Sequence, residues 1–245
     1  MISEPANVGT VALLRERASV RDFRRDPVDH SLVEELLAAA VRAPTSFNFQ
    51  AYSFILVRSE WRRMRLAELT GKRFVADAPV FVLVCADVTR LWEFGARNGE
   101  PVGPEQADLA LSAVIDASLA GMCLALSAES MGLGTVMVGA IRNRLSEIAE
   151  LVALPMDVTA LFGMCIGWPA AWPASRPRLS PDLVVHQERY QAKPVEKETT
   201  TLWKPSGLVS RTEAAHWRSE ILRGLRLVQQ RHQKPGAMAN FVTAS

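Results

Sequence analysis

The chain has 245 residues, of which 49% are hydrophobic and 22% are charged, a composition typical of a globular protein with one large domain or two small ones. Its formal net charge of +2 is too close to neutrality for a nucleic-acid-binding protein, and its Lys and Arg residues are spread along the sequence. Any cationic function must therefore be local.

The first predicted helix follows a short basic segment. Ser31 and Glu34 have the spacing of a capping box, which predicts a helix that begins at Ser31 and ends before Pro44. Strands and helices then alternate: a strand at 53–58, a charged helix at 60–70, an apolar strand at 79–86 and a long loop at 89–104.

Residues 109–126 form an apolar run about as long as a membrane span. Asp116 lies in the middle of this run and argues against insertion, because a carboxylate exposed to lipid is energetically expensive. Four alanines, Ala110, Ala113, Ala117 and Ala120, permit close packing on one face. We therefore expect a buried central helix that runs to about Met131 and can pack against its own copy in a dimer.

The second half of the chain continues the alternation. A glycine-containing strand is expected within 132–140, a helix at 143–153 and a strand at 159–168. Buried strands separated by helices predict a sheet covered on both faces, in the α/β or α+β class. Prolines are frequent after Trp168, where we expect irregular structure, and residues 211–232 have the periodicity of a basic helix.

The three cysteines, Cys85, Cys123 and Cys165, lie in apolar runs without metal-ligand spacing. We interpret them as buried hydrophobic residues in a reducing compartment. The N-terminus has no basic region leading into an apolar one, so the sequence predicts no secretory signal and a cytoplasmic protein.

Two short segments pair guanidinium groups in a way that suits a phosphate ligand. Arg17, Ser19 and Arg21 would share one face of an extended segment and could converge on one anion. Arg176 and Arg178 flank a proline that would reduce the entropy lost on binding. Each segment alone could equally be a solvated basic loop, but two of them in a near-neutral chain favour a binding role.

The segment GLGTVMVGA at 132–140 superficially resembles a dinucleotide-binding fingerprint, but Met137 occupies the position of the required third glycine. Gly139 still permits close approach of a flat ring to the backbone. The four histidines are isolated and no G-x-S-x-G motif is present, so neither a metal site nor a hydrolase is favoured. The pattern suits a cofactor enzyme.

The segment RAPTSFNFQ at 42–50 adds two hydroxyls and an amide side chain that could hydrogen-bond the edge of a heterocycle. With RERASVRDFRRDPV at 15–28, GLGTVMVGAIRNR at 132–144 and LFGMCIGWPAAWPASRPRLSPDLVVHQERY at 161–190, it resembles the FMN-dependent nitroreductase family. The resemblance covers about residues 10–190. It is strongest to the NADPH-dependent oxygen-insensitive nitroreductase and FMN reductase group.

This resemblance implies an α+β sandwich with a central mixed sheet flanked by helices, in an intertwined homodimer with two FMN sites at its interface. It implies a core at 1–190 and a partly helical C-terminal arm at 191–245 that packs on the partner subunit. Neither a nucleic acid nor a membrane is an expected partner.

The implied reaction transfers a hydride from NADPH or NADH to FMN, and then two electrons to a nitroaromatic, quinone or free flavin in a ping-pong cycle. Two alternatives stay open: other flavin chemistry of the same superfamily, such as a dehalogenase or dehydrogenase, and a flavin-binding protein without turnover. The physiological acceptor and the choice between NADPH and NADH also stay open.

The resemblance assigns contacts with the FMN to a set of residues along the chain: Arg17, Ala18, Ser19, Arg21, Thr45, Ser46, Lys72, Val138, Gly139, Ala140, Arg176 and Arg178. Thr45 and Ser46, with Asn48 nearby, would come from the opposite subunit. Arg21 and Lys72 would stabilise reduced flavin, and Arg211 would bind the NADPH 2′-phosphate. No side-chain nucleophile and no metal are required.

The sequence departs from the family pattern at three positions. Ala18 replaces a usual arginine, Met137 a common tyrosine, and Ala140 the second residue of a glycine pair. The first change removes one cation from the expected phosphate site, which neighbouring Arg17 could compensate.

Overall fold

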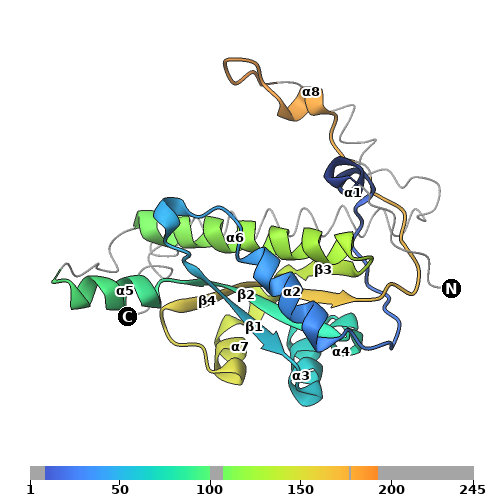
Figure 1. Ribbon diagram of the computed structural model, residues 1–245, viewed down its shortest axis with the longest axis horizontal. Helices are drawn as coiled ribbons and strands as arrows, with labels where there is room; N and C mark the ends of the chain where they lie inside the picture. Colours follow the sequence, from blue (N-terminus) through green and yellow to red (C-terminus); the bar gives the residue numbers. More distant parts are fainter. Residues whose placement is uncertain (1–8, 100–106, 177, 193–245) are drawn as a thin grey trace. The chain divides into compact units, whose positions relative to one another are not determined.

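The structure is a computed structural model that describes residues 9–99, 107–176 and 178–192 (Figure 1). The chain divides into two compact units, with the boundary between Ser175 and Arg176. The sequence places the end of the core later, near residue 190.

The first unit is built on one sheet of four strands in the order β1-β2-β4-β3. The strands are β1 Tyr52–Val57, β2 Val80–Asp87, β3 Gly134–Val138 and β4 Val158–Gly167. All three strand pairs are antiparallel, although a mixed sheet is expected from the sequence. Among the described residues the one parallel pairing is an isolated bridge between Ser19 and Thr135, at the outer edge of β3.

Helices cover both faces of the sheet, as the apolar strands predict (Figure 1). The helices of the first unit are α1 Thr10–Glu16, α2 His30–Ala40, α3 Glu60–Thr70, α4 Phe74–Asp77, α5 Thr89–Arg97, α6 Ala107–Ser130 and α7 Leu145–Val152. Two 3₁₀ turns accompany them, η1 Ser46–Asn48 and η2 Gly139–Arg144. The second unit contains α8 Pro181–Val184.

The central strand β2 is buried along its whole length, and its side chains alternate between two apolar clusters. Phe81, Leu83 and Cys85 belong to the cluster that includes α3 and α7 residues. Val82 instead packs in the cluster formed with α2 and α6, while Val84 packs in a third cluster along α6. A continuous apolar run is therefore required here, because neither face of β2 reaches water.

Two local predictions differ from the structure. Helix α2 begins at His30, with Asp29 at the N-cap and no side-chain capping bond, so the capping box of Ser31 is not formed. Helix α5 occupies much of the expected loop at 89–104. Its start is supported by the Asp87 carboxylate, which accepts hydrogen bonds from the Thr89 backbone N–H at 3.0 Å and from its hydroxyl at 2.5 Å.

The long helix α6 is apolar enough to cross a membrane by length and composition alone. It packs against α2 and all four strands, and its Asp116 is fully buried. We therefore interpret α6 as the central core helix that the sequence predicts. One stripe of α6 nevertheless exposes three large apolar side chains at helical spacing: Leu111, Ile115 and Leu119.

Candidate flavin site

The first half of the candidate site is the extended segment beside the edge strand β3. The Val20 backbone N–H donates to the Thr135 carbonyl oxygen at 2.9 Å. Ala18 and Val20 are buried, whereas Ser19 is half-buried and Arg21 is exposed on the alternate side. Burial therefore alternates along residues 18–21, and Ala18 has no polar side chain to offer a ligand.

Arg17 in the same segment is directed into the protein. Its Nε lies 3.3 Å from Oε1 of Glu129, at the end of α6, and its side chain is only 17% exposed. The Thr135 hydroxyl donates to the same carboxylate oxygen at 2.5 Å. Burial raises the pKa of Glu129, although the hydrogen bond from Thr135 and the charge of Arg17 both act to lower it. The positive charge of Arg17, which the sequence assigns to phosphate binding, is therefore largely neutralised by Glu129.

The second half of the candidate site is the turn η1 and the residues around it. Thr45 and Ser46 are half-buried, and Asn48 is exposed. The Ser46 backbone N–H donates to Oδ1 of Asp116 in α6 at 2.9 Å. The second half is thus attached to the same helix as the first.

A single chain does not bring these two halves together. The first half lies at the outer edge of β3 and the second precedes β1, the strand at the other edge of the sheet. At a rise of about 1.5 Å per residue, Asp116 and Glu129 lie about 20 Å apart along α6. In Figure 1, β3 lies toward one end of α6 and the blue turn before β1 toward the other.

The predicted backbone contacts follow the end of β3. Val138 is buried and Gly139 is exposed at the start of η2. The Arg142 guanidinium lies above Gly139, where an added Cβ would be 3.2 Å from one of its nitrogens. Lys72 is exposed between α3 and α4, and α3 packs against η2. Met137, which replaces a common tyrosine, is 37% exposed.

The remaining predicted contacts lie beyond the first unit. Arg176 and Arg178 are exposed in the second unit, where an Arg178 guanidinium nitrogen donates to the Arg176 carbonyl oxygen at 3.1 Å. Their part in a shared site stays a prediction. Arg211 lies outside the described residues.

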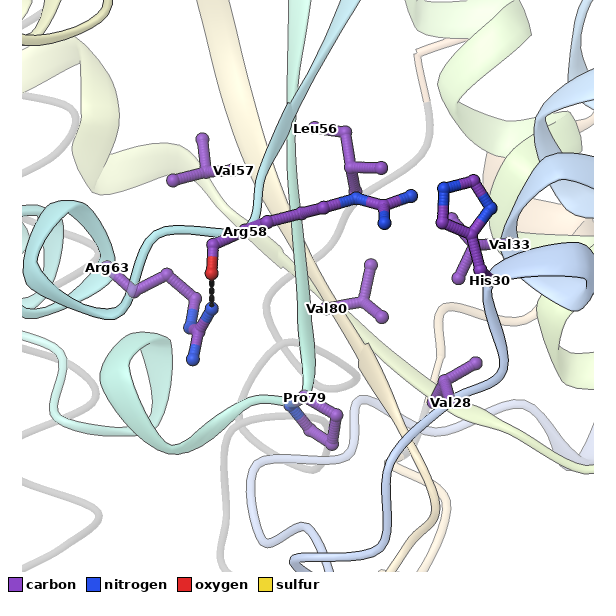
Figure 2. A pocket seen from close by; sticks show the side chains of 9 residues that line it. All are labelled: Val28, His30, Val33, Leu56, Val57, Arg58, Arg63, Pro79 and Val80. Carbon is purple, nitrogen blue, oxygen red and sulfur yellow. Dashed lines mark hydrogen bonds between the residues drawn. The ribbon is translucent and has the colours of Figure 1, made fainter.

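A surface pocket of about 160 Å³ is present elsewhere, at the end of β1 and the start of β2. Figure 2 shows the Arg58 side chain extending toward His30 over Val80, while Arg63 donates to the Arg58 carbonyl oxygen. None of the predicted site residues lines this pocket. It lies at the opposite end of β1 from the η1 turn, so we do not assign it to the flavin site.

Comparison with known proteins identifies the family. The family described as "Nitroreductase family" matches residues 14–168, so the chain belongs to this family. It is 38% identical over 185 residues to the oxygen-insensitive NADPH nitroreductase of Salmonella typhimurium, covering 74% of this chain and 75% of the relative. The fold and family predicted from the sequence are confirmed.

Two solved structures have the same fold. Nitroreductase A from Vibrio parahaemolyticus superimposes with a TM-score of 0.78 at 30% identity, covering 89% of this chain and 90% of that one. The NADPH:FMN oxidoreductase of Vibrio harveyi in complex with NAD⁺ has a TM-score of 0.76 at 28% identity, covering 89% and 91%.

Three residues with important contacts were not assigned a role at the site from sequence. In the sequence Asp116 argues only against a membrane helix, and Glu129 and Arg90 belong to no motif. The available signal is the presence of two carboxylates, Asp116 and Glu129, within the apolar part of this helix after Asp108. Acidic residues are rarely buried unless they have partners, so each marked an unseen contact.

Proposed function

We propose that this chain is an FMN-containing oxidoreductase that uses NADPH or NADH to reduce nitroaromatics, quinones or free flavin. The observation that carries this proposal is the alternation of burial in the segment beside β3, where Ala18 and Val20 are buried and Ser19 and Arg21 lie on the accessible side. A guanidinium and a hydroxyl on one accessible edge suit a phosphate. The names of its relatives, NADPH nitroreductase and NADPH:FMN oxidoreductase, support the same activity.

The protein's contribution is binding and electrostatics. When bound, FMN supplies the redox chemistry, accepting a hydride from the nicotinamide and passing two electrons to the acceptor. Ser19 and Arg21 would contact the ribityl chain and the pyrimidine edge of the ring, Arg176 and Arg178 would hold the phosphate, and the exposed backbone at Gly139 would lie beneath the ring. We assign to Arg21 and Lys72 the stabilisation of negative charge near the ring.

We further propose a homodimer in which each site combines the Arg17–Arg21 segment of one chain with Thr45 and Ser46 of the other. The separation of the two halves within one chain supports this arrangement. The exposed apolar stripe of Leu111, Ile115 and Leu119 on α6 supports it independently, because contiguous exposed apolar surface is characteristic of interfaces.

The free state of all three cysteines agrees with a cytoplasmic enzyme.

The flavin assignment has a direct test. The purified protein should be yellow, and NADPH should bleach it in the absence of air. Arg21→Ala and Arg178→Ala should each lower the FMN content without a matching loss of thermal stability. A colourless protein that stays colourless after incubation with FMN would refute the assignment.

The shared site can be tested by co-expressing two defective chains. Arg21→Ala damages one half of each site, and Ser46→Tyr fills the other half. If the halves come from different chains, the purified heterodimer contains one intact site and one doubly damaged site, so it binds FMN at about one per two chains. If both halves came from the same chain, the heterodimer would have no intact site.

Two further measurements address the substrates. Arg211→Ala should raise the KM for NADPH while leaving that for NADH nearly unchanged, and equal effects would exclude a role in binding the 2′-phosphate. Steady oxidation of NADPH in the presence of a quinone would distinguish the enzyme from a flavin-binding protein without turnover. A screen of nitroaromatic, quinone and halogenated acceptors would distinguish it from other flavin chemistry of the superfamily.

A further inference from the structure

The η1 turn and the residues just after it have an unfavourable backbone conformation. Phe47, Asn48 and Gln50 have φ values of 48°, 59° and 51°, in the left-handed region that L-residues other than glycine rarely adopt. Such conformations persist only where the surrounding structure fixes them, and they are concentrated at functional sites. Contacts with other parts of the protein must therefore hold the backbone of this turn in the left-handed conformation.

Apolar packing does not provide that explanation. Phe47 is 90% exposed and Phe49 is 37% exposed, and the two rings contact each other with their centroids 5.5 Å apart. Within one chain, side chains this exposed contribute little burial energy toward holding their own backbone. Hydrogen bonds supply the constraint within the chain.

Asp116 of α6 supplies the first set of hydrogen bonds. Its Oδ1 accepts from the Ser46 N–H at 2.9 Å, and its Oδ2 accepts from the Ala51 N–H at 3.3 Å. These two amides lie on either side of the three left-handed residues, so a single carboxylate fixes both ends of the turn. The carboxylate is fully buried, and its two backbone donors offset the cost of that burial.

Arg90 of α5 supplies the second set of hydrogen bonds. One of its terminal nitrogens donates to the carbonyl oxygens of Gln50 at 3.1 Å and Tyr52 at 2.6 Å. Its other terminal nitrogen lies 3.2 Å from the buried carboxylate of Asp87. The guanidinium is thereby oriented by one fixed group while it binds two carbonyls.

We propose that Asp116 and Arg90 are positioning residues for the flavin site: together they fix the strained turn that presents Thr45 and Ser46 to the flavin ring of the partner subunit. Asp116 binds the N–H groups on either side of the left-handed residues, and Arg90 binds the carbonyl of Gln50 and that of Tyr52 at the start of β1. This inference rests on the proposed function, because it concerns the ring side of the same site. It assigns neither residue a direct contact with the cofactor.

Asparagine at position 116 provides a sharp test because it keeps the shape of the side chain. It has one acceptor oxygen where aspartate has two, and its NH₂ group would face a backbone N–H. Asp116→Asn should therefore release one end of the turn without creating a cavity. Ser118→Ala is the matched control, because the exposed Ser118 hydroxyl donates only to the Val114 carbonyl oxygen within the same helix.

Hydrogen exchange of the cofactor-free protein measures the turn without the flavin. In Asp116→Asn, the amides of Ser46 and Ala51 should exchange at least about tenfold faster, as local opening becomes easier, while β1 and the rest of α6 stay protected. Ser118→Ala should match the wild type. Unchanged protection of Ser46 and Ala51 in Asp116→Asn would overturn the proposal.

Comparing riboflavin with FMN then separates the ring side from the phosphate side. Asp116→Asn should weaken the affinity for both ligands by the same factor, at least about tenfold or 1.4 kcal/mol. Arg178→Ala, at a position that the family resemblance assigns to the phosphate, should weaken FMN alone, because riboflavin lacks the phosphate. Equal loss of both ligands is not expected from a defect confined to the phosphate contacts.

The outcomes distinguish the two proposals. If the wild type binds FMN and Asp116→Asn binds both ligands as tightly, the positioning role is wrong while the proposed function stands. If the wild type binds no FMN, the proposed function fails and so does the role at a flavin site. Should Asp116→Asn fail to fold, Arg90→Gln at an exposed position should show the same equal weakening, and an unaltered affinity would again refute the inference.

Discussion

The Glu129 carboxylate lies 3.3 Å from the Arg17 Nε and also accepts the Thr135 hydroxyl bond, so one buried group joins α6, β3 and the basic segment beside it. The position of Arg21, four residues further on, depends on this connection. Glu129 therefore contributes to the candidate phosphate site through the backbone of the segment. Neither its side chain nor most of Arg17 reaches water.

Removing only one partner of this ion pair should be costly. Glu129→Leu leaves the Arg17 guanidinium largely buried beside an apolar side chain, and breaking such a pair costs about 3–5 kcal/mol. The double substitution Arg17→Met with Glu129→Leu should lose less stability than Glu129→Leu alone, because no uncompensated charge remains. Urea unfolding of Glu129→Leu, Arg17→Met and the double variant measures the difference, and simple additivity of the two single losses would contradict the coupling.

The stability of the protein should fall in acid partly because of Asp87. Burial acts to raise the pKa of this carboxyl, but hydrogen bonds from Ser53 and Thr89 and the charge of Arg90 outweigh it and lower the pKa below the ordinary value of 3.8. The contribution is therefore complete above pH 3.8 and is lost as the pH falls through the folded-state pKa.

The substitution Asp87→Asn isolates this effect. It should lower the free energy of unfolding near neutral pH, where the carboxylate forms its hydrogen bonds with Ser53, Thr89 and Arg90. It should also flatten the decline of that free energy below about pH 4. Urea unfolding at a series of pH values measures both, and parallel curves for the variant and wild type would contradict the prediction.

Two helix ends offer a matched pair of glycine exchanges. Ala153 ends α7 with φ 54° and ψ 49°, and Gly71 ends α3 with φ 64° and ψ 28°. Ala153→Gly should stabilise the protein by about 0.5–1 kcal/mol, because glycine adopts this conformation without steric cost. Gly71→Ala should cost about 1–2 kcal/mol, and no atom within 4 Å would obstruct the added methyl. The denaturant midpoint should therefore rise in Ala153→Gly and fall in Gly71→Ala.

Gly163 in β4 is required for a different reason, which is the space taken by Phe81 in β2. A Cβ at position 163 would overlap the Phe81 ring, which is fully buried. Gly163→Ala should therefore destabilise the protein by at least about 1–3 kcal/mol. Adding Phe81→Leu should recover part of that loss, since it removes the overlapping ring atoms. If the second substitution only added to the loss in thermal unfolding, overlap would not be the cause.

Regular elements with clear periodicity were predictable from the sequence. The helix predicted at 60–70 has the observed ends. Its charged sequence favours a helix, and Gly71, in the left-handed conformation, ends it. The differences at α2 and α5 are both local: no side chain caps the first turn of α2, whereas a side chain outside the expected pattern binds the first free N–H of α5. At Thr89 this was Asp87, two residues earlier in the chain.

The site was predictable as a set of residue types but not as a set of contacts. The basic segment shows that Arg17 carries a charge, whereas its partner Glu129 lies on another element far along the chain. The left-handed conformation of Phe47 was also hidden, because the turn contains no glycine. Asp116 and Arg90, which fix that turn, become visible only in three dimensions.

Helix α6 attaches to the ring-side turn through Asp116 and to the phosphate-side segment through Glu129. In the proposed homodimer these two attachments belong to different FMN sites, so each α6 helix connects the two sites of the enzyme. A rotation of α6 would therefore disturb both sites at once. Adaptation to larger or smaller electron acceptors is therefore expected in the flanking loops, where a change at one centre leaves the shared scaffold in place.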